Sequence, residues 1–233
     1  MKVSILLIIA VFLAAGASRA VAQFGAGIGA GLVAAGDGVS QAAGDLKEFI
    51  SKDSLTFSDA TGNIGFTVVG RVRYALSELF RLNGDASVAF FSSENVQLTS
   101  ASADLADTSV NATFEVGTTV IPISAGLHVG FPAGPLRPFV GADIGMTFVS
   151  RTYTFVSGNT GGVNQVEIEN KSAGDPEIGV ALNAGADVTL GPVALEIGAR
   201  YNLANLLSQD DGEDPMKYLR VGLALIFQSG GAE

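Results

Sequence analysis

The chain has 233 residues, with 13 Lys and Arg against 23 Asp and Glu, one His, no Cys and no Trp. The missing Cys excludes disulfides and thiolate zinc sites, and the formal net charge of −10 argues against a nucleic-acid binder. Charged residues make up only 15 % of the chain and the mean hydropathy is +0.40, which excludes a disordered chain.

The first residues predict an export signal. Lys2 gives a positive start, residues 3–15 form a 13-residue apolar run interrupted once by a serine, and residues 20–22 (Ala-Val-Ala) match a signal-peptidase site. A run of this length is short for a membrane-spanning helix, which needs about 20 residues. We therefore predict a signal peptide over residues 1–22 and one mature domain over residues 23–233.

The mature chain contains eight segments that alternate between apolar residues and polar or small ones. A period of two is typical of strands whose two faces meet different surroundings. The last segment shows the pattern clearly, because Leu, Val and Phe occupy one face and Arg220, Gly222 and Ala224 the other. The first segment is rich in Gly and specifies its register poorly. In chain order, the predicted strands are residues 24–34, 64–75, 81–91, 119–131, 136–151, 178–190, 193–202 and 219–227.

The connections between these segments alternate in length. The predicted short turns are residues 76–80, 132–135 and 191–192, and the predicted long polar segments are residues 35–62, 92–116, 153–175 and 203–217. Barrels of the bacterial outer membrane have this asymmetry, with short periplasmic turns and long external loops. The pattern places both ends of the mature chain in the periplasm.

Charge and aromatic residues indicate which face of the strands meets lipid. The four long segments carry 16 acids and four Lys, whereas Arg and acids balance in the rest of the mature chain. The uncharged face is an unbroken apolar band, which would aggregate in water but suits lipid. Its aromatic residues fall at strand ends, as in interfacial girdles. The predicted girdles are Phe24, Tyr74, Phe131 and Phe227 at the periplasmic side, and Phe66, Phe90, Phe148 and Tyr201 at the external side.

At this point the chain resembles a known family. The end of the last segment, with Arg220, Gly222, Leu225 and Phe227, resembles the signal read by the barrel-assembly machinery, although residues 228–233 follow the aromatic. Residues 23–233 resemble the small eight-stranded outer-membrane β-barrels of Gram-negative bacteria. The resemblance implies an all-β, antiparallel up-and-down transmembrane barrel with short periplasmic turns and long external loops. It also implies an outer-membrane location, with membrane lipids and the assembly machinery as partners.

The interior of an eight-stranded barrel is just wide enough for side chains to fill it. We therefore predict a plug of polar residues, with a proton or ion path as the functional alternative. Tight turns would place Arg71 opposite Asp85, Asp187 opposite Glu196, and Asn183 opposite Arg200. We expect Arg137, at a similar depth, to supply the cation for the two facing acids. The predicted luminal network is Arg71, Asp85, Arg137, Asp143, Asp187, Glu196, Arg200 and Arg220.

Two further features of the sequence could carry catalysis or metal binding. His128 is the only histidine, hence the only ready general base. A tight turn at 132–135 would set it opposite Phe139 and pair Ser124 with Asp143, which is too far for a catalytic triad. The acidic run Asp210, Asp211, Glu213 and Asp214 offers carboxylates for Ca²⁺, but its spacing is not that of an EF-hand. We predict no catalytic residue, no cofactor and a solvated acidic loop.

The most consistent function is that of an integral outer-membrane protein that displays acidic loops, with divalent cations as possible partners of those loops. Three alternatives remain open from the sequence. The first is a narrow channel or small porin, the second is a lipid-modifying outer-membrane enzyme, and the third is a soluble exported barrel.

Overall fold

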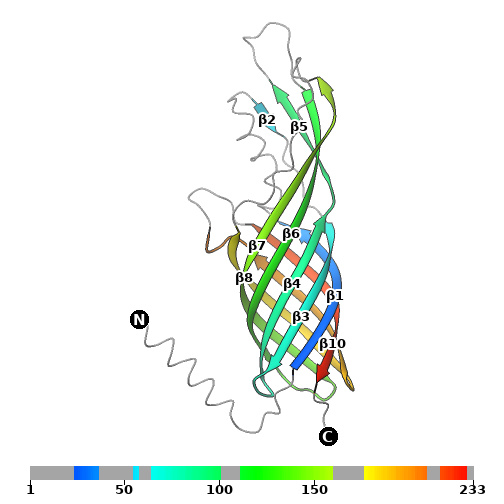
Figure 1. Cartoon of the computed structure of the whole chain (residues 1–233), viewed down its shortest axis with the longest axis vertical. Helices are drawn as coiled ribbons and strands as arrows, with labels where there is room; N and C mark the ends of the chain where they lie inside the picture. The colour runs from blue at the N-terminus through cyan, green and yellow to red at the C-terminus, as the bar shows by residue number, and fades with distance from the viewer. Residues whose placement is uncertain are drawn as a thin grey trace, which may run out of the picture.

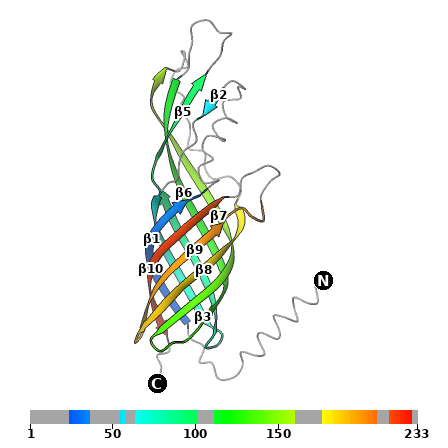
Figure 2. The ribbon, with the colours of Figure 1, turned by 180° about the vertical axis from the view of Figure 1, so that it is seen from behind.

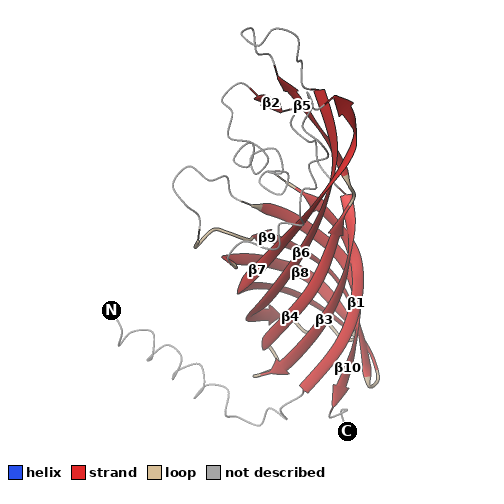
Figure 3. Ribbon diagram, turned by 45° about the horizontal axis from the view of Figure 1, so that its top comes forward, coloured by secondary structure: helices blue, strands red, loops and turns tan. Residues whose placement is uncertain are grey.

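The structure is a computed structural model that describes residues 24–36, 55–57, 64–100, 111–159, 176–208 and 216–229. Strands and their turns make up these ranges (Figure 3). Among the described residues, no helix has the length and hydrophobicity to span a membrane. The strands are β1 (Phe24–Ala35), β2 (Leu55–Phe57), β3 (Ile64–Ala75), β4 (Phe80–Phe91), β5 (Glu94–Ser100), β6 (Asn111–Gly130), β7 (Leu136–Asn159), β8 (Glu177–Leu190), β9 (Val193–Leu203) and β10 (Lys217–Ser229).

Eight of these strands form a closed antiparallel barrel (Figure 1). Their order around the wall is β1, β3, β4, β6, β7, β8, β9 and β10, and β10 pairs with β1 to close the ring. Phe24, at the start of β1, pairs with Ser229, at the end of β10, so the barrel begins and ends at one rim. The predicted eight-stranded barrel is confirmed, and each predicted strand is one of its eight.

Two of the short turns are Gly-Pro pairs. Gly134 has a φ of 66° and Gly191 a φ of 68°. Glycine with positive φ at the first central position is the requirement of a type II′ hairpin turn, whose twist suits two flanking strands. The connection after Leu190 is therefore two residues long, as predicted from the sequence.

The turn between β6 and β7 differs from the prediction. Ala133 pairs with Leu136, so the loop is only Gly134-Pro135, whereas the whole of 132–135 was predicted to form it. The pairing of β6 with β7 therefore differs from the predicted register by two residues, because Gly134-Pro135 alone makes the turn. As a result, His128 lies opposite Gly141, and its predicted position opposite Phe139 was wrong.

Beyond the external rim, four strands continue as an open sheet. β6 and β7 rise well above the other barrel strands, β5 pairs with the upper part of β6, and β2 pairs with β5 (Figure 1). Residues 35–62, 92–116 and 153–175 were predicted to be loops, which was wrong for β2, β5, the start of β6 and the end of β7. These stretches lack the apolar face of a membrane strand, and an antiparallel sheet in water does not need one.

The step from barrel to external sheet is marked by one extra residue. Ala89 pairs with Val120, and Glu94 pairs with Val116, so β4 and β5 together use one residue more than β6 over this interval. An extra residue on one strand bends it and increases its twist, as in a β-bulge. The irregularity separates the part of β6 that lies in the barrel wall from the part that stands above it.

Glycine makes the closing seam possible. β1 and β10 lie side by side (Figure 2), and Gly27, Gly29 and Gly31 of β1 face the lumen there. A Cβ atom on Gly27 would lie 2.1 Å from the carbonyl oxygen of Leu225, and one on Gly29 would lie 2.4 Å from that of Leu223. The backbones of the two strands approach too closely for any side chain at these positions. The Gly-rich segment that specified its register least is thus the one that closes the barrel.

Candidate functional site

The two faces of every barrel strand meet opposite surroundings. Outward residues are apolar and exposed, as with Ile28 at 69 % and Leu182 at 57 %. Inward residues include most of the charges of the barrel, and Arg71 is only 7 % exposed. We define the charged layer as the luminal residues Arg71, Arg73, Arg81, Asp85, Arg137, Asp143, Asp187, Glu196, Arg200 and Arg220. Because charges are stable in a narrow interior only when they are paired, their contacts decide what the lumen does.

Asp85 is the centre of one group in the charged layer. Arg71 lies opposite it across β3 and β4, as the sequence predicted, and donates from Nη2 at 2.6 Å. Arg220 of β10 reaches across the lumen and donates to both carboxylate oxygens, at 3.0 and 2.8 Å. Its Nη1 also donates to Ser87 at 3.0 Å. One carboxylate thus joins strands that are not neighbours in the sheet.

The second group surrounds two acids that face each other. Asp187 lies opposite Glu196 across β8 and β9, as predicted. Arg73 donates to Asp187 at 3.0 Å, and Arg81 forms an ion pair with the other oxygen of the same carboxylate. Glu196 forms ion pairs with both Arg71 and Arg73. The cations that neutralise these acids come from β3 and β4, on the other side of the lumen.

Arg137 does not have the role predicted for it. It lies opposite Asp187 in the β7–β8 register, yet the oxygens of Asp187 are taken by Arg73 and Arg81. The Nε and Nη2 atoms of Arg137 are buried and donate to no acceptor among the described residues. The prediction failed because it considered only the neighbouring strand, whereas arginines are long enough to cross a narrow lumen.

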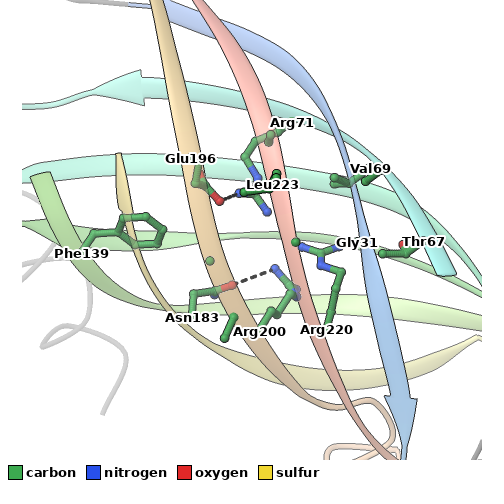
Figure 4. Close-up of a pocket in the computed structure, with 15 residues that line it drawn as sticks. Gly31, Thr67, Val69, Arg71, Phe139, Asn183, Glu196, Arg200, Arg220 and Leu223 are labelled. Carbon is green, nitrogen blue, oxygen red and sulfur yellow. Dashed lines mark hydrogen bonds and ion pairs between the residues drawn. The ribbon is translucent and has the colours of Figure 1, made fainter. Parts of the chain in front are cut away.

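The third group surrounds Asp143. Asn183 donates to it at 3.0 Å, and Arg200, which lies opposite Asn183 as predicted, forms an ion pair with the same oxygen. Arg200 also donates to Ser124 at 2.7 Å. Figure 4 shows Arg200 beside Asn183, and Arg71 beside Glu196, around the same internal space.

His128 is built into this third group. Its Nε2 lies 3.2 Å from Asp143, and its ring stacks on Phe139 with centroids 5.3 Å apart. The side chain is buried, and a Cβ on Gly141 would lie 2.2 Å from its ring. Ser124 lies opposite Gly145, so its predicted pairing with Asp143 was wrong, and its hydroxyl accepts from Arg200. The arrangement holds a buried histidine in place between Asp143 and Phe139.

An apolar cluster closes the lumen above the charged layer. Phe91 and Tyr218 meet edge to face with ring centroids 6.3 Å apart, although β3 and β1 separate their strands in the wall. We call this cluster the external apolar layer, and it consists of Val33, Ala89, Phe91, Val120, Ala204, Met216 and Tyr218. Side chains from opposite walls therefore fill the barrel at its external end.

The space within the charged layer is small. A cavity of about 30 Å³ lies among residues that include Arg71, Asn183, Glu196, Arg200 and Arg220 (Figure 4). That is room for ordered water among charged groups, far less than a solvent-filled path. Below it, Ala194, Ala224 and Ile226 form a smaller apolar cluster toward the periplasmic end.

Arg73 and Arg81 are functional residues that the predicted network missed. Arg73 is two residues from Arg71, and Arg81 is four from Asp85, so both share the inward face of their strands. The period of two therefore contained the signal for their orientation. Their partners lie across the lumen, and a pattern along single strands does not give that distance.

The predicted girdle residues point outward near the two rims. Phe24 lies opposite Tyr74, and Phe66 stacks on Phe90 with centroids 4.9 Å apart. In the predicted assembly signal, Arg220 faces the lumen, whereas Leu225 and Phe227 are exposed on the outer wall.

The acidic run 210–214 lies outside the described residues. Within the described ranges, no group of three or more His, Cys, Asp or Glu is placed to hold a metal ion.

A closed antiparallel barrel with an apolar outer band and a charged interior defines an integral protein of the bacterial outer membrane. The family model for the outer membrane protein beta-barrel domain matches residues 3–227, and the chain belongs to this family. The chain accordingly resides in the outer membrane, with lipid around its wall. A search of curated protein sequences gave no match.

Solved structures of outer-membrane proteins are similar to this chain. Neisserial surface protein A is similar with a TM-score of 0.50 and 14 % identity, over 88 % of this chain and 96 % of that one. The attachment invasion locus protein of Yersinia pestis, bound to the heparin analogue sucrose octasulfate, has a TM-score of 0.43 and 12 % identity, over 88 % and 99 %. OprG of Pseudomonas aeruginosa has a TM-score of 0.40 and 11 % identity, over 88 % and 96 %.

Proposed function

We propose that this chain is a closed membrane anchor that displays its external strands and loops to partners outside the cell, and that it neither conducts ions nor catalyses a reaction. The observation that carries the proposal is the external apolar layer, in which Phe91 and Tyr218 meet across the lumen. Apolar side chains at this position exclude water, and the charged layer beneath them is held together by ion pairs. The part of the protein left to act is the part outside the membrane.

The external sheet supports this proposal. β2, β5 and the upper parts of β6 and β7 form a platform above the rim (Figure 1). The four segments predicted as external loops carry 16 acids and four Lys. Such a surface favours basic partners and divalent cations over anionic ones. Assembly in the membrane would use the signal at the end of β10.

Electrical recording tests the closed lumen. The folded protein, inserted in a planar lipid bilayer, should give no discrete current steps. Phe91→Ala, which opens the external apolar layer, serves as the sensitised control, and heat-modifiable mobility on a gel confirms that both proteins are folded. Discrete steps from the wild type that change in size with Phe91→Ala would replace the anchor proposal with that of a narrow channel.

Mass spectrometry of lipid A tests the absence of catalysis. Cells with and without the protein should give identical lipid A masses, because His128 is buried against Asp143 and Phe139. His128→Gln is the control variant. A change in lipid A mass that the wild type produces and His128→Gln does not would establish a lipid-modifying enzyme.

Limited proteolysis tests the proposed role of divalent cations. Millimolar Ca²⁺ or Mg²⁺ should slow cleavage within residues 203–217 more than Na⁺ does at equal ionic strength, because a divalent cation binds carboxylates beyond simple screening. Equal cleavage rates in the two salts would show that the acids only keep the loops solvated.

A further inference from the structure

The charged layer has more cations than it can pair. Among the described residues it contains six arginines and four carboxylates. The excess is not spread evenly, because Asp85 and Asp143 bind Arg71, Arg200 and Arg220 higher in the barrel. Nearer the periplasmic mouth, Asp187 accepts from Arg73 and Arg81, and Glu196 opposite it pairs with Arg71 and Arg73. Arg137 is at the same end, at the second position of β7, and is left over.

Two nitrogen atoms of the Arg137 guanidinium have no hydrogen-bond acceptor among the described residues. Its Nε and Nη2 atoms are buried and unbonded within the described structure. It lies over Gly130 of β6, where a Cβ would be only 2.3 Å from Nε. A buried charged donor that makes no hydrogen bond is costly, and native proteins usually satisfy such a group with water or an ion. Because Gly130 has no side chain, it leaves space for the guanidinium of Arg137, whose Nε and Nη2 atoms have no acceptor within the described structure.

The surroundings of Arg137 indicate the charge of what it binds. The charged groups that act on it are Arg81, Asp187 and Glu78. Arg81 is only 15 % exposed, so the two guanidinium groups stand near each other in a partly buried mouth. A cavity of about 20 Å³, lined in part by Arg73 and Arg81, opens in the same mouth. Two arginines with spare donors favour an anion, and their fork geometry fits the oxygens of a phosphate.

We propose that the periplasmic mouth of the lumen binds a phosphate-class oxyanion between Arg137 and Arg81. The shared chemistry is a phosphate group with at least two free oxygens, supplied either by inorganic phosphate or by the headgroup of an anionic phospholipid in the inner leaflet. The site is at the opposite end of the barrel from the external sheet, so it can be tested independently of the proposed function.

Calorimetric titration of the refolded protein with inorganic phosphate, in micelles and at constant ionic strength, tests the site. The wild type should bind phosphate saturably, and Arg137→Gln should bind at least tenfold more weakly. Lys217→Gln, which removes the same charge at the external end, should leave the affinity unchanged. Arg137→Gln should also remain folded in phosphate-free buffer, since Arg137 is only partly buried and two of its donors make no hydrogen bond within the described structure.

Gly130→Ala keeps every charge but displaces the guanidinium of Arg137, and should weaken phosphate binding as well. Nanodiscs separate the two sources of phosphate. Binding of free phosphate that persists in phosphatidylcholine discs and is lost when phosphatidylglycerol is included assigns the site to a lipid headgroup, whereas binding in both assigns it to free phosphate. Absence of saturable binding in micelles and in both kinds of disc, or equal affinity of the wild type and Arg137→Gln, overturns the proposal.

Discussion

The two ends of the lumen are built from opposite materials. The external end is filled by the external apolar layer, in which Val120 is fully buried. The middle and periplasmic end are filled by the charged layer, in which Asp187 is equally buried but accepts from Arg73 and Arg81. The external end is packed with apolar groups, whereas the rest of the lumen is packed mainly with paired charges and ends in a partly exposed mouth.

The difference shows which end can respond to solutes. An apolar layer holds together without a ligand, and the hydroxyl of Tyr218 is the single polar side-chain group among its seven residues. A charged layer is stable only while its charges are balanced, and here the arginines outnumber the carboxylates by two within the described lumen. We therefore expect the periplasmic end to be sensitive to ions and the external end to be insensitive to them. The substitutions below test this contrast.

The largest effect should come from breaking a pair in the charged layer. Arg200→Ala leaves Asp143 without its cation and should lower the free energy of unfolding by about 3–5 kcal/mol. Urea unfolding in lipid vesicles, followed by far-ultraviolet circular dichroism, measures this. The double variant with Asp143→Ala should recover part of the loss, and strictly additive losses would show that the pair does not hold the layer together.

The next prediction concerns the outer wall, whose apolar band does not differ between the two ends as the lumen does. Leu182→Arg places a charge on the exposed apolar band and should lower the free energy of unfolding by about 2–4 kcal/mol if the residue is near the bilayer midplane. Leu182→Ala, which keeps the wall apolar, is the matched control. An arginine tolerated as well as alanine in vesicle unfolding would place this face away from lipid.

A matched pair of valines compares the two ends of the lumen directly. Val120→Thr buries a hydroxyl in the external apolar layer and should cost about 1–3 kcal/mol. Val69→Thr makes the same change beside the polar cavity, where water can bond the hydroxyl, and should cost less than about 1 kcal/mol. Equal losses in urea unfolding would mean that the two regions of the lumen are equally polar surroundings for a hydroxyl group.

The smallest effect concerns the apolar cluster near the periplasmic end. Ile226 is fully buried with Ala194 and Ala224, and Ile226→Val should lower the free energy of unfolding by about 0.5–1.5 kcal/mol. Leu225→Val, on the exposed wall, removes a methylene group that faces lipid and serves as the control. A larger loss for the control would show that packing inside the lumen contributes little at this end.

The barrel was predictable because its physical cause repeats along the chain. A strand between lipid and a polar interior must alternate with a period of two, and eight segments did so. The pairings of Arg71 with Asp85 and of Asn183 with Arg200 followed from tight turns. The external sheet was not predictable in the same way, since its strands lack the unbroken apolar face that lipid requires of a barrel strand.

The candidate site was predicted only in part. The inward orientation of its charges followed from the strands, whereas their partners did not. Asp85 with Arg220, and Asp187 with Arg81, are contacts across the lumen that depend on barrel diameter and arginine length. The external apolar layer was not predicted either, because Val33, Val120 and Tyr218 are apolar residues on the inward face, where the alternation predicts polar ones.

The glycine seam has a consequence for how the protein folds. β1 pairs with β10 over its whole length, so its final partner is the last strand to be synthesised. Contacts between such distant segments form late, and an unpaired strand edge can aggregate while it waits. Glycine has low β-propensity and weakens a strand edge as a template for wrong pairings. One edge of β1 pairs with β3, and the glycines make its other edge a weak template for wrong partners until β10 arrives.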